Sequence, residues 1–182
     1  MNRKETTKFL SDLLISEKFS GMGKYWAREV SIDPTRSELS KRVDFMQFMP
    51  PGQTTVSAIE KGIFVCYEIK SCREDVFSGN GLNFIGEKNY IVTTMQGYKD
   101  ILPDYRDGTL NEHIKKLNGR KGNYGILVAM PEGADPFEEM NKPTPIETKC
   151  TWKLSTMIKC FEGLREKSMT ELLFCMLRSG KN

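Results

Sequence analysis

The chain has 182 residues, of which 38% are hydrophobic, enough for one domain with a sizeable core. Its 27 Lys and Arg against 24 Asp and Glu give a net charge of +3, so it lacks the global basicity of many nucleic-acid-binding proteins. The single histidine, His113, excludes metal sites built from several histidines and leaves little material for a Ser-His or Cys-His nucleophile. Polar chemistry then depends on carboxylates, lysines and a hard cation.

The polar segment 1–5 is not followed by the long apolar run typical of a signal peptide or a membrane span. The five cysteines contain neither a C-x-x-C pair nor a regular framework. We expect them to be buried, reduced thiols. These features together predict a soluble, cytoplasmic protein with no membrane partner.

The first third of the chain predicts a helix and two strands. Thr6 or Thr7 can cap a helix that runs to about Phe19. Residues 25–32 alternate apolar and polar side chains and predict a strand. Its two faces are expected to carry Trp26, Arg28 and Val30 on one side and Ala27, Glu29 and Ser31 on the other. Residues 42–49 predict a second strand, which the two following prolines end.

The middle of the chain carries the strongest strand pattern. Residues 63–72 are rich in β-branched and aromatic side chains and apolar on both faces, so we expect them in the middle of a sheet. A short, irregular helix is expected within 75–88 and a buried strand over 89–94. A helix near 110–117 and a strand over 124–130 follow.

At the C-terminal end, residues 152–178 carry apolar side chains at helical spacing, which predicts one long helix, or two with a break near Ser168. The order helix, three strands, helix, strand indicates an α/β fold, with a mixed central sheet flanked by helices. We expect a single domain over 1–182, with its core at about 5–131 and an added helical extension at about 150–179.

Two charged residues interrupt the apolar central strand. Glu68 and Lys70 lie two positions apart and therefore share one face. Burying them costs several kcal/mol unless they are paired, so a structural ion pair is one explanation. The E-x-K pattern by itself is weak, and it recurs at 147–149 in a polar connection. The first copy differs because another acid, Asp44, lies on the preceding strand.

If these two strands pair as neighbours, Asp44 and Glu68 can hold one divalent cation. Two carboxylates, a backbone carbonyl and waters are the oxygen ligands that Mg²⁺ prefers. Such a cation lowers the pKa of a bound water and stabilises charge on a phosphate, and a nearby lysine can position the attacking water. The alternative is a structural charge cluster without catalysis.

Four segments carry a family resemblance: RVDF at 42–45, FVCYEIKSCREDV at 64–76, SGNGLNFIGEKNYIV at 78–92 and YGILVAMPEG at 124–133. Together they resemble the PD-(D/E)XK nuclease superfamily. More closely, they are similar to its MmcB-like branch, including versions carried by phages and prophages of Gram-positive bacteria. The resemblance covers about 26–131.

This resemblance implies a restriction-endonuclease-like core and a metal-dependent nuclease that hydrolyses DNA phosphodiester bonds in phage or bacterial DNA processing or repair. It makes Asp44, Glu68 and Lys70 the catalytic residues. It implies Mg²⁺ or Mn²⁺ as the cofactor, bound by Asp44, Glu68 and the backbone carbonyl of Ile69. For a phage-encoded protein, the cytoplasm would be that of the bacterial host.

An acid N-terminal to this pair often completes such sites. Glu29 and Glu17 both qualify, and we favour Glu29 because it lies on the adjoining strand. The chain departs from the family in two places. Val43 replaces the proline before the first acid, and Asn80 stands where phage-type relatives tend to have a histidine.

The clearest basic cluster consists of Lys115, Lys116, Arg120 and Lys121. It could contact a nucleic-acid backbone, although a solvated loop explains it at least as well. The resemblance implies DNA more than RNA as that partner. Arg73 could contact a substrate phosphate or belong to the start of the next helix. The resemblance is also compatible with a catalytically inactive nucleic-acid-binding or regulatory protein. The methionine-bearing C-terminal helix is a candidate homodimer contact.

Overall fold

The structure, a computed structural model, describes residues 2–32, 41–52, 55–119 and 122–179. A six-stranded mixed sheet runs through it in the order of the chain. The strands are β1 (Tyr25–Ile32), β2 (Lys41–Met49), β3 (Ile63–Ile69), β4 (Lys88–Thr94), β5 (Gly125–Pro131) and β6 (Trp152–Ile158). β1, β2 and β3 are antiparallel, β3 to β5 are parallel, and β6 is antiparallel to β5. This confirms the predicted α/β class and the mixed sheet.

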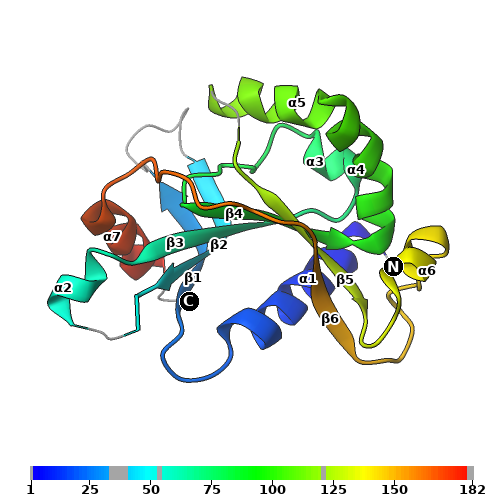
Figure 1. Cartoon of the computed structure of the whole chain (residues 1–182), viewed down its shortest axis with the longest axis horizontal. Coiled ribbons are helices and arrows are strands. Elements are labelled where there is room, and N and C mark those ends of the chain that lie inside the picture. The colour runs from blue at the N-terminus through cyan, green and yellow to red at the C-terminus, as the bar shows by residue number, and fades with distance from the viewer. Residues whose placement is uncertain (1, 33–40, 53–54, 120–121, 180–182) are drawn as a thin grey trace.

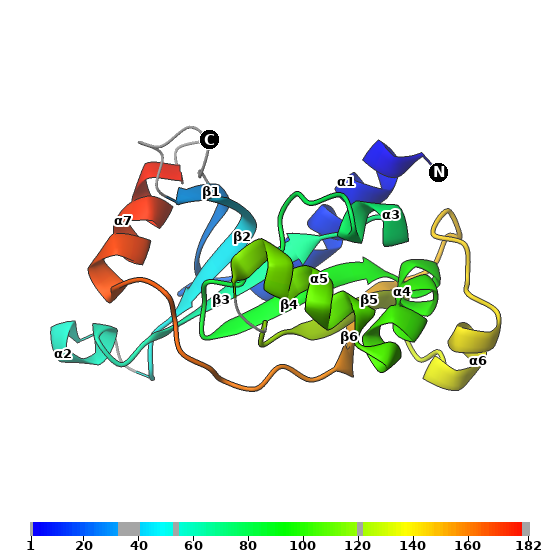
Figure 2. The same ribbon diagram turned by 90° about the horizontal axis from the view of Figure 1, so that it is seen from above.

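Helices cover both faces of the sheet (Figure 1). They are α1 (Arg3–Leu14), continued by a π-helical turn η1 (Ile15–Phe19), then α2 (Val56–Ile59), α3 (Arg73–Val76), α4 (Met95–Asp107), α5 (Thr109–Asn118), α6 (Pro136–Asn141) and α7 (Met169–Ser179). α1 lies on one face, and α3, α4 and α5 lie on the other. Seen from above, α7 and α6 lie at opposite ends of the molecule (Figure 2).

The alternation of side chains along β3 divides the core between these faces. Val65 and Tyr67 pack with Leu10 of α1. Phe64 and Cys66 point to the other side, where α7 covers them. Further along that second face, a larger cluster joins β4 and β5 to α4 and α5. Glu68 shares this second face with Phe64 and Cys66.

The first helix begins earlier than the sequence predicts. Asn2 is its N-cap: the Asn2 side chain accepts a hydrogen bond from the Glu5 N–H at 3.0 Å, and the Glu5 carboxylate accepts one from the Asn2 N–H at 2.9 Å. The expectation of Thr6 or Thr7 as the cap is wrong. Both hydroxyls instead donate to the carbonyl four residues earlier, which Thr can do inside a helix.

The expected division of β1 into two faces is also wrong. Glu29 has a left-handed backbone with φ +53°, which interrupts the alternation of side chains. As a result, Ala27 packs with Val30 and Ile32 beneath α7, whereas Trp26 packs on the α1 face. No strand pairing is assigned at Glu29 itself, although its neighbours pair with β2 on both sides.

Helix α5 confirms the helix expected near 110–117, but α4 was not predicted. Pro103 lies inside α4, where a proline normally breaks a helix. The helix is well bounded nevertheless, because the Thr94 hydroxyl accepts the Gly97 N–H at 3.0 Å and the left-handed Gly108 ends it. Its apolar side packs into the core, so tertiary packing outweighs the local effect of the proline.

The prediction of helix over 152–178 is wrong in its first part. Residues 152–158 form β6, which pairs with the edge of β5, and only α7 is helical. Leu154 packs on the α1 face of the core, while Phe161 and Leu164 are exposed, so the apolar spacing does not form one buried stripe. The short helix α6 was not predicted either. This segment becomes a strand because it can pair with an open edge of the sheet, and the local spacing of apolar residues carries no information about that edge.

The burial of the cysteines and the character of the helices bear on two of the expectations from composition. Cys66, Cys160 and Cys175 are buried, but Cys150 is exposed and Cys72 is intermediate, so the expectation of five buried thiols is wrong. Within the described ranges, none of the helices combines the length and the apolar character needed to cross a membrane.

Gly125 provides a test of the β5–β6 pairing. A Cβ at this position would lie 2.5 Å from the Ile158 carbonyl oxygen and 2.8 Å from the Cys160 nitrogen. We expect Gly125→Ala to lower the free energy of unfolding by about 1–3 kcal/mol, because β6 must shift. Gly163→Ala is the matched control, because its nearest neighbour is the movable end of the Asn123 side chain at 3.0 Å. Urea denaturation of both variants measures the difference; equal losses would contradict the pairing.

Candidate functional site

A cavity of about 960 Å³ opens at the end of the sheet where β2 begins and β3 ends. Its lining includes Asp44, Glu68 and Lys70, so the structure brings the three predicted catalytic residues together. The α1 helix and the loop 79–83 contribute the surrounding residues. β2 and β3 are neighbours, as the sequence argument assumed.

Asp44 lies where β2 and β3 separate. The last ladder pair is Phe45 with Tyr67, and beyond it the Asp44 carboxylate accepts the Ile69 N–H at 2.8 Å. The N–H and C=O of one residue in a strand point to the same edge, so the Ile69 carbonyl also faces β2. Burial raises the pKa of Asp44 above its ordinary value, and the charge of Glu29 adds to this effect.

The Glu68 carboxyl group is buried with one oxygen unsatisfied. Its residue is 1% exposed, and Oε1 accepts the Asn83 N–H at 3.2 Å. Oε2 has no hydrogen-bond partner among the described residues. Burial, and then the negative charge of Asp44, raise the pKa of Glu68 to about 8, although Lys70 acts in the opposite direction. An unpartnered buried carboxylate oxygen is costly, which makes this atom the candidate ligand-binding atom of the cavity.

Lys70 is held on the same side of the sheet. It is 4% exposed, its ammonium donates to the Asn80 carbonyl at 2.6 Å, and it lies 3.9 Å from Asp75 Oδ1. Asp75 is itself fixed, because its Oδ2 accepts the Ser71 N–H at 3.1 Å and the Ser71 hydroxyl at 3.0 Å. The lysine is therefore buried and anchored next to the two carboxylates.

A glycine loop closes over this pair. Gly81 has φ +74°, and a Cβ built there would lie 2.7 Å from Glu68 Oε2 and 3.1 Å from Lys70 Nζ. Gly79 also has a left-handed backbone, at φ +80°, but a Cβ there would meet nothing within 4 Å. Gly81 is thus required for close approach as well as for the turn.

The two candidate additional acids lie in different places. Glu29 lines the cavity, where its carboxylate forms an ion pair with Arg42 at 2.8 Å and its side chain is about half exposed. Glu17 lies outside the cavity and accepts the Leu154 N–H at 2.9 Å. Of the two, the structure places only Glu29 beside Asp44.

Of the residues expected to contact nucleic acid, those that the structure describes do not line the cavity. Arg73 forms two hydrogen bonds to the Asp104 carboxylate, at 2.7 and 2.8 Å, and lies over the Phe77 ring. These contacts join α3 to α4 and account for Arg73 structurally. Lys115 and Lys116 are exposed on α5. Arg120 and Lys121 lie outside the described residues.

Sequence reasoning missed most of the cations that do line the cavity. Arg28, Lys41 and Arg42 come from β1 and β2, and Arg3 comes from α1. Arg3, Thr7 and Ser11 follow each other at intervals of four, which places them on one face of the helix. That spacing is a signal in the sequence, but without the fold nothing links it to Glu68.

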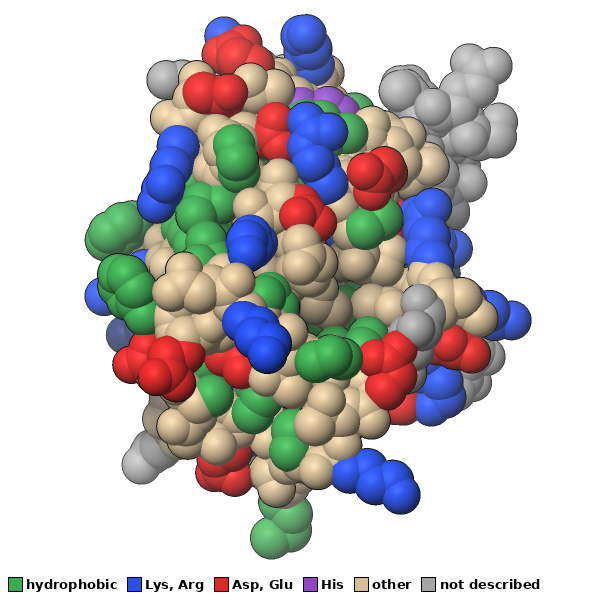
Figure 3. Space-filling view, turned by 90° about the vertical axis from the view of Figure 1, so that its right-hand side faces the viewer, with side chains coloured by type: hydrophobic (Ala, Val, Ile, Leu, Met, Phe, Trp, Pro, Cys, Tyr) green, Lys and Arg blue, Asp and Glu red, His purple; other side chains and the backbone are tan. Residues whose placement is uncertain are grey.

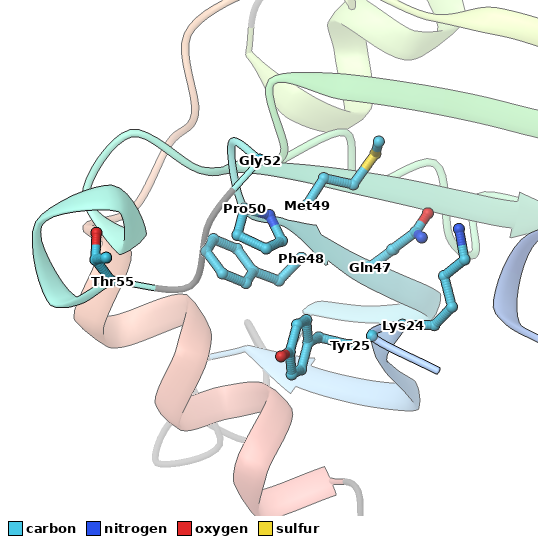
Figure 4. Close-up of a pocket in the computed structure, with 9 residues that line it drawn as sticks. Lys24, Tyr25, Gln47, Phe48, Met49, Pro50, Gly52 and Thr55 are labelled. Atoms are coloured by element: carbon cyan, nitrogen blue, oxygen red, sulfur yellow. The ribbon is translucent and has the colours of Figure 1, made fainter. Parts of the chain in front are cut away.

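Other surfaces offer less chemistry. A second hollow lies at the other end of β1 and β2, lined by Lys24, Tyr25, Gln47, Phe48, Met49 and neighbouring residues (Figure 4). None of the described residues that line it carries a carboxylate. On the face of the molecule at the α6 end, basic and acidic side chains are interspersed and no large patch of one sign is visible (Figure 3). The charged cavity is therefore the strongest candidate site.

The donor set of the cavity fits a hard divalent cation. Asp44 and Glu68 supply carboxylate oxygens, and the Ile69 carbonyl faces the same edge. The unpartnered Glu68 Oε2 is the atom that such a cation would satisfy. No group of three or more His, Cys, Asp or Glu side chains in the described chain is arranged for a metal, so a cation here would also need the carbonyl and waters.

Comparison with known proteins found no match for this chain. No protein-family model matches this chain, and neither a curated protein nor a solved structure matches it significantly. The functional argument therefore depends on the geometry of the cavity.

The two loop glycines provide a matched pair of substitutions. Both Gly79→Ala and Gly81→Ala place an L-residue in a left-handed conformation, which costs about 1–2 kcal/mol. We expect Gly81→Ala to lose roughly 1–3 kcal/mol more in the free energy of unfolding, because its Cβ collides with Glu68 and Lys70. Guanidinium denaturation measures the difference. Equal destabilisation would show that the loop does not close over the pair.

The raised pKa of Glu68 predicts a specific pH dependence. The folded protein keeps a proton up to about pH 8 that the unfolded chain releases above its ordinary value of 4.5, so raising the pH favours unfolding. In the absence of metal, the Glu68 carboxyl group should make the free energy of unfolding fall by roughly 1.4 kcal/mol for each unit by which the pH rises between those two pKa values. Glu68→Gln should remove that slope. Denaturation in EDTA across this range, with the exposed Glu60→Gln as control, tests it; an unchanged slope in Glu68→Gln would refute it.

Proposed function

We propose that this protein is a Mg²⁺- or Mn²⁺-dependent phosphodiesterase that hydrolyses DNA. The observation that carries the proposal is the buried, unpartnered Oε2 of Glu68 beside the Asp44 carboxylate. Burial and the Asp44 charge raise the pKa of Glu68, and a divalent cation would stabilise two carboxylates placed in this way. A purely structural cluster would be expected to satisfy both oxygens of a buried carboxylate.

The residues of the cavity have distinct roles in this proposal. Asp44, Glu68 and the Ile69 carbonyl would hold the cation, and Glu29 would complete the acidic set through water or substrate. When bound, the cation supplies charge neutralisation at the phosphate and a lower pKa for the attacking water. Glu68 would hold the cation in its ionised form, with its proton released to solvent. The Lys70 ammonium donates to a phosphate oxygen or orients the water.

The topology supports a restriction-endonuclease-like core. α1 is followed by three antiparallel strands, the short helix α3 and the parallel strand β4. This is the order that the sequence resemblance implies, and the acid pair lies where the second strand begins and the third strand ends. The preference for DNA over RNA, and a role in phage or bacterial DNA processing or repair, follow from that resemblance.

The rival is a catalytically inactive nucleic-acid-binding protein on the same fold. It is favoured by the contacts of Lys70, whose ammonium is directed to the Asn80 carbonyl and to Asp75. Activity would require the lysine to redirect one of its N–H groups to substrate.

A homodimer through α7 is also a proposal. The apolar side of α7 packs on β1, but Phe174 and Leu177 of the same helix are 61% and 74% exposed.

The second E-x-K copy provides internal controls for this proposal. We expect calorimetry to detect Mn²⁺ binding to the wild type, and Asp44→Asn and Glu68→Gln to weaken it at least about tenfold. Mn²⁺-dependent cleavage of plasmid and single-stranded DNA should fall about 10²–10³-fold in Lys70→Ala. Glu147→Gln and Lys149→Ala, which are exposed, should leave both measurements unchanged.

Equal Mn²⁺ binding by the wild type and Asp44→Asn would remove the metal assignment. DNA binding without metal-dependent cleavage would favour the inactive rival.

A further inference from the structure

The carboxylate of Asp75 joins the N-terminal helix to the site. Its Oδ1 forms an ion pair with Arg3 Nη2 and lies 3.9 Å from Lys70 Nζ. One oxygen therefore faces two cations, and these cations lie close to each other. The Asp75 side chain is 10% exposed, whereas that of Arg3 is 64% exposed. A guanidinium has five N–H donors, so Arg3 keeps donors available to the cavity.

α1 continues this contact along the cavity wall. Thr7 and Ser11 follow Arg3 on the same helical face, and all three line the cavity. The Thr7 hydroxyl donates its proton to the Arg3 carbonyl at 3.0 Å, so the hydroxyl donor that this wall offers to a phosphate is that of Ser11. Cations and hydroxyl groups are the side chains that contact phosphate and sugar in nucleic-acid complexes.

The opposite wall also carries arginines. Arg28 and Arg42 come from β1 and β2 and line the cavity, where Arg42 is paired with Glu29 at 2.8 Å. Arg28 is exposed and has no ion-pair partner among the described residues. The floor between the walls holds Asp44 and the recessed Glu68. A polyanion that passes over the floor would thus meet positive charge on both sides.

The lining of the cavity offers few side chains that could recognise bases. Phe45 is its only described aromatic residue, and it is 5% exposed, so no ring is presented for stacking. Binding would come from the phosphates and would be tolerant of sequence and strongly dependent on salt.

We propose that the cavity is a backbone-binding track for a single nucleic-acid strand, in which Arg3 and Ser11 bind the phosphate next to the one at Lys70. Asp75 is the positioning residue that holds Arg3 beside Lys70. This inference deepens the proposed function, on which it rests, by naming the substrate as single-stranded nucleic acid or an unpaired strand end.

The recessed floor favours a single strand over a duplex. Glu68 and Lys70 are 1% and 4% exposed, so a phosphate must enter the cavity to reach them. Duplex DNA is stiff, with a persistence length of about 150 base pairs, and bending or unpairing it costs several kcal/mol. A single strand can turn its backbone into the cavity without that cost.

Fluorescence anisotropy with a short labelled oligothymidylate tests the track. It is measured in EDTA over a series of salt concentrations, so that neither metal nor cleavage contributes. We expect Arg3→Ala to weaken binding several-fold and to lower the slope of log K against log salt by about 0.7, the value for one phosphate contact on a single strand. Lys4→Ala is the matched control, because Lys4 is the next residue of the same helix, is exposed and does not line the cavity.

A second pair of variants leaves the Arg3–Asp75 ion pair intact. Ser11→Glu places a negative charge on the track and should weaken binding, whereas Ser16→Glu, outside the cavity, should not. Unlabelled single strand should displace the probe better than a hairpin duplex of the same length.

Three results would overturn the proposal: equal effects of Arg3→Ala and Lys4→Ala, a duplex that competes as well as the single strand, or no binding by the wild type. Binding as expected but without Mn²⁺-dependent cleavage would support the track and count against the phosphodiesterase.

Discussion

The burial of the Glu68 carboxyl group beside Asp44 is the constraint on which the site depends. β3 lies inside the sheet, between β2 and β4, so the last residues of this strand cannot turn to solvent. Asn83 satisfies one oxygen of Glu68, and the other is left without a partner in the described chain. An apolar strand that retains such a group is locally less stable than an uninterrupted one, and unfavourable groups of this kind concentrate at functional sites.

The separation of β2 from β3 creates the space that this group faces. After the pair Phe45–Tyr67, the Ile69 N–H turns to the Asp44 side chain in place of a β2 carbonyl. The left-handed backbone of Glu29 interrupts β1 at the matching position. The same irregularities that break the regular ladder bring carboxylates from three strands to one opening. Loop and helix then enclose it, through Gly81 over the floor and Arg3 along the wall.

The positions of the first strands were predicted well from nearby residues, whereas features that depend on distant contacts were not. β1, β2 and β3 are where the sequence places them, although the left-handed Glu29 changes the faces of β1. Residues 152–158 have an equally regular helical spacing but form a strand, because the open edge of β5 supplies a ladder of hydrogen bonds. Thr6 and Thr7 are good caps in isolation, yet Asn2 takes that place because Glu5 completes the capping box.

The sequence by itself determined that Glu68 and Lys70 share one face of a buried strand, because side-chain direction in a strand follows from spacing alone. It also singled out Asp44 as an acid on the preceding strand. Only the tertiary structure decided that Asp44 bonds to Ile69, that Lys70 is anchored by Asn80, and that Arg3 reaches the site through Asp75. Arg3 and Asp75 are 72 positions apart in the chain, and no local pattern records a contact that exists only after the helix has packed on the sheet.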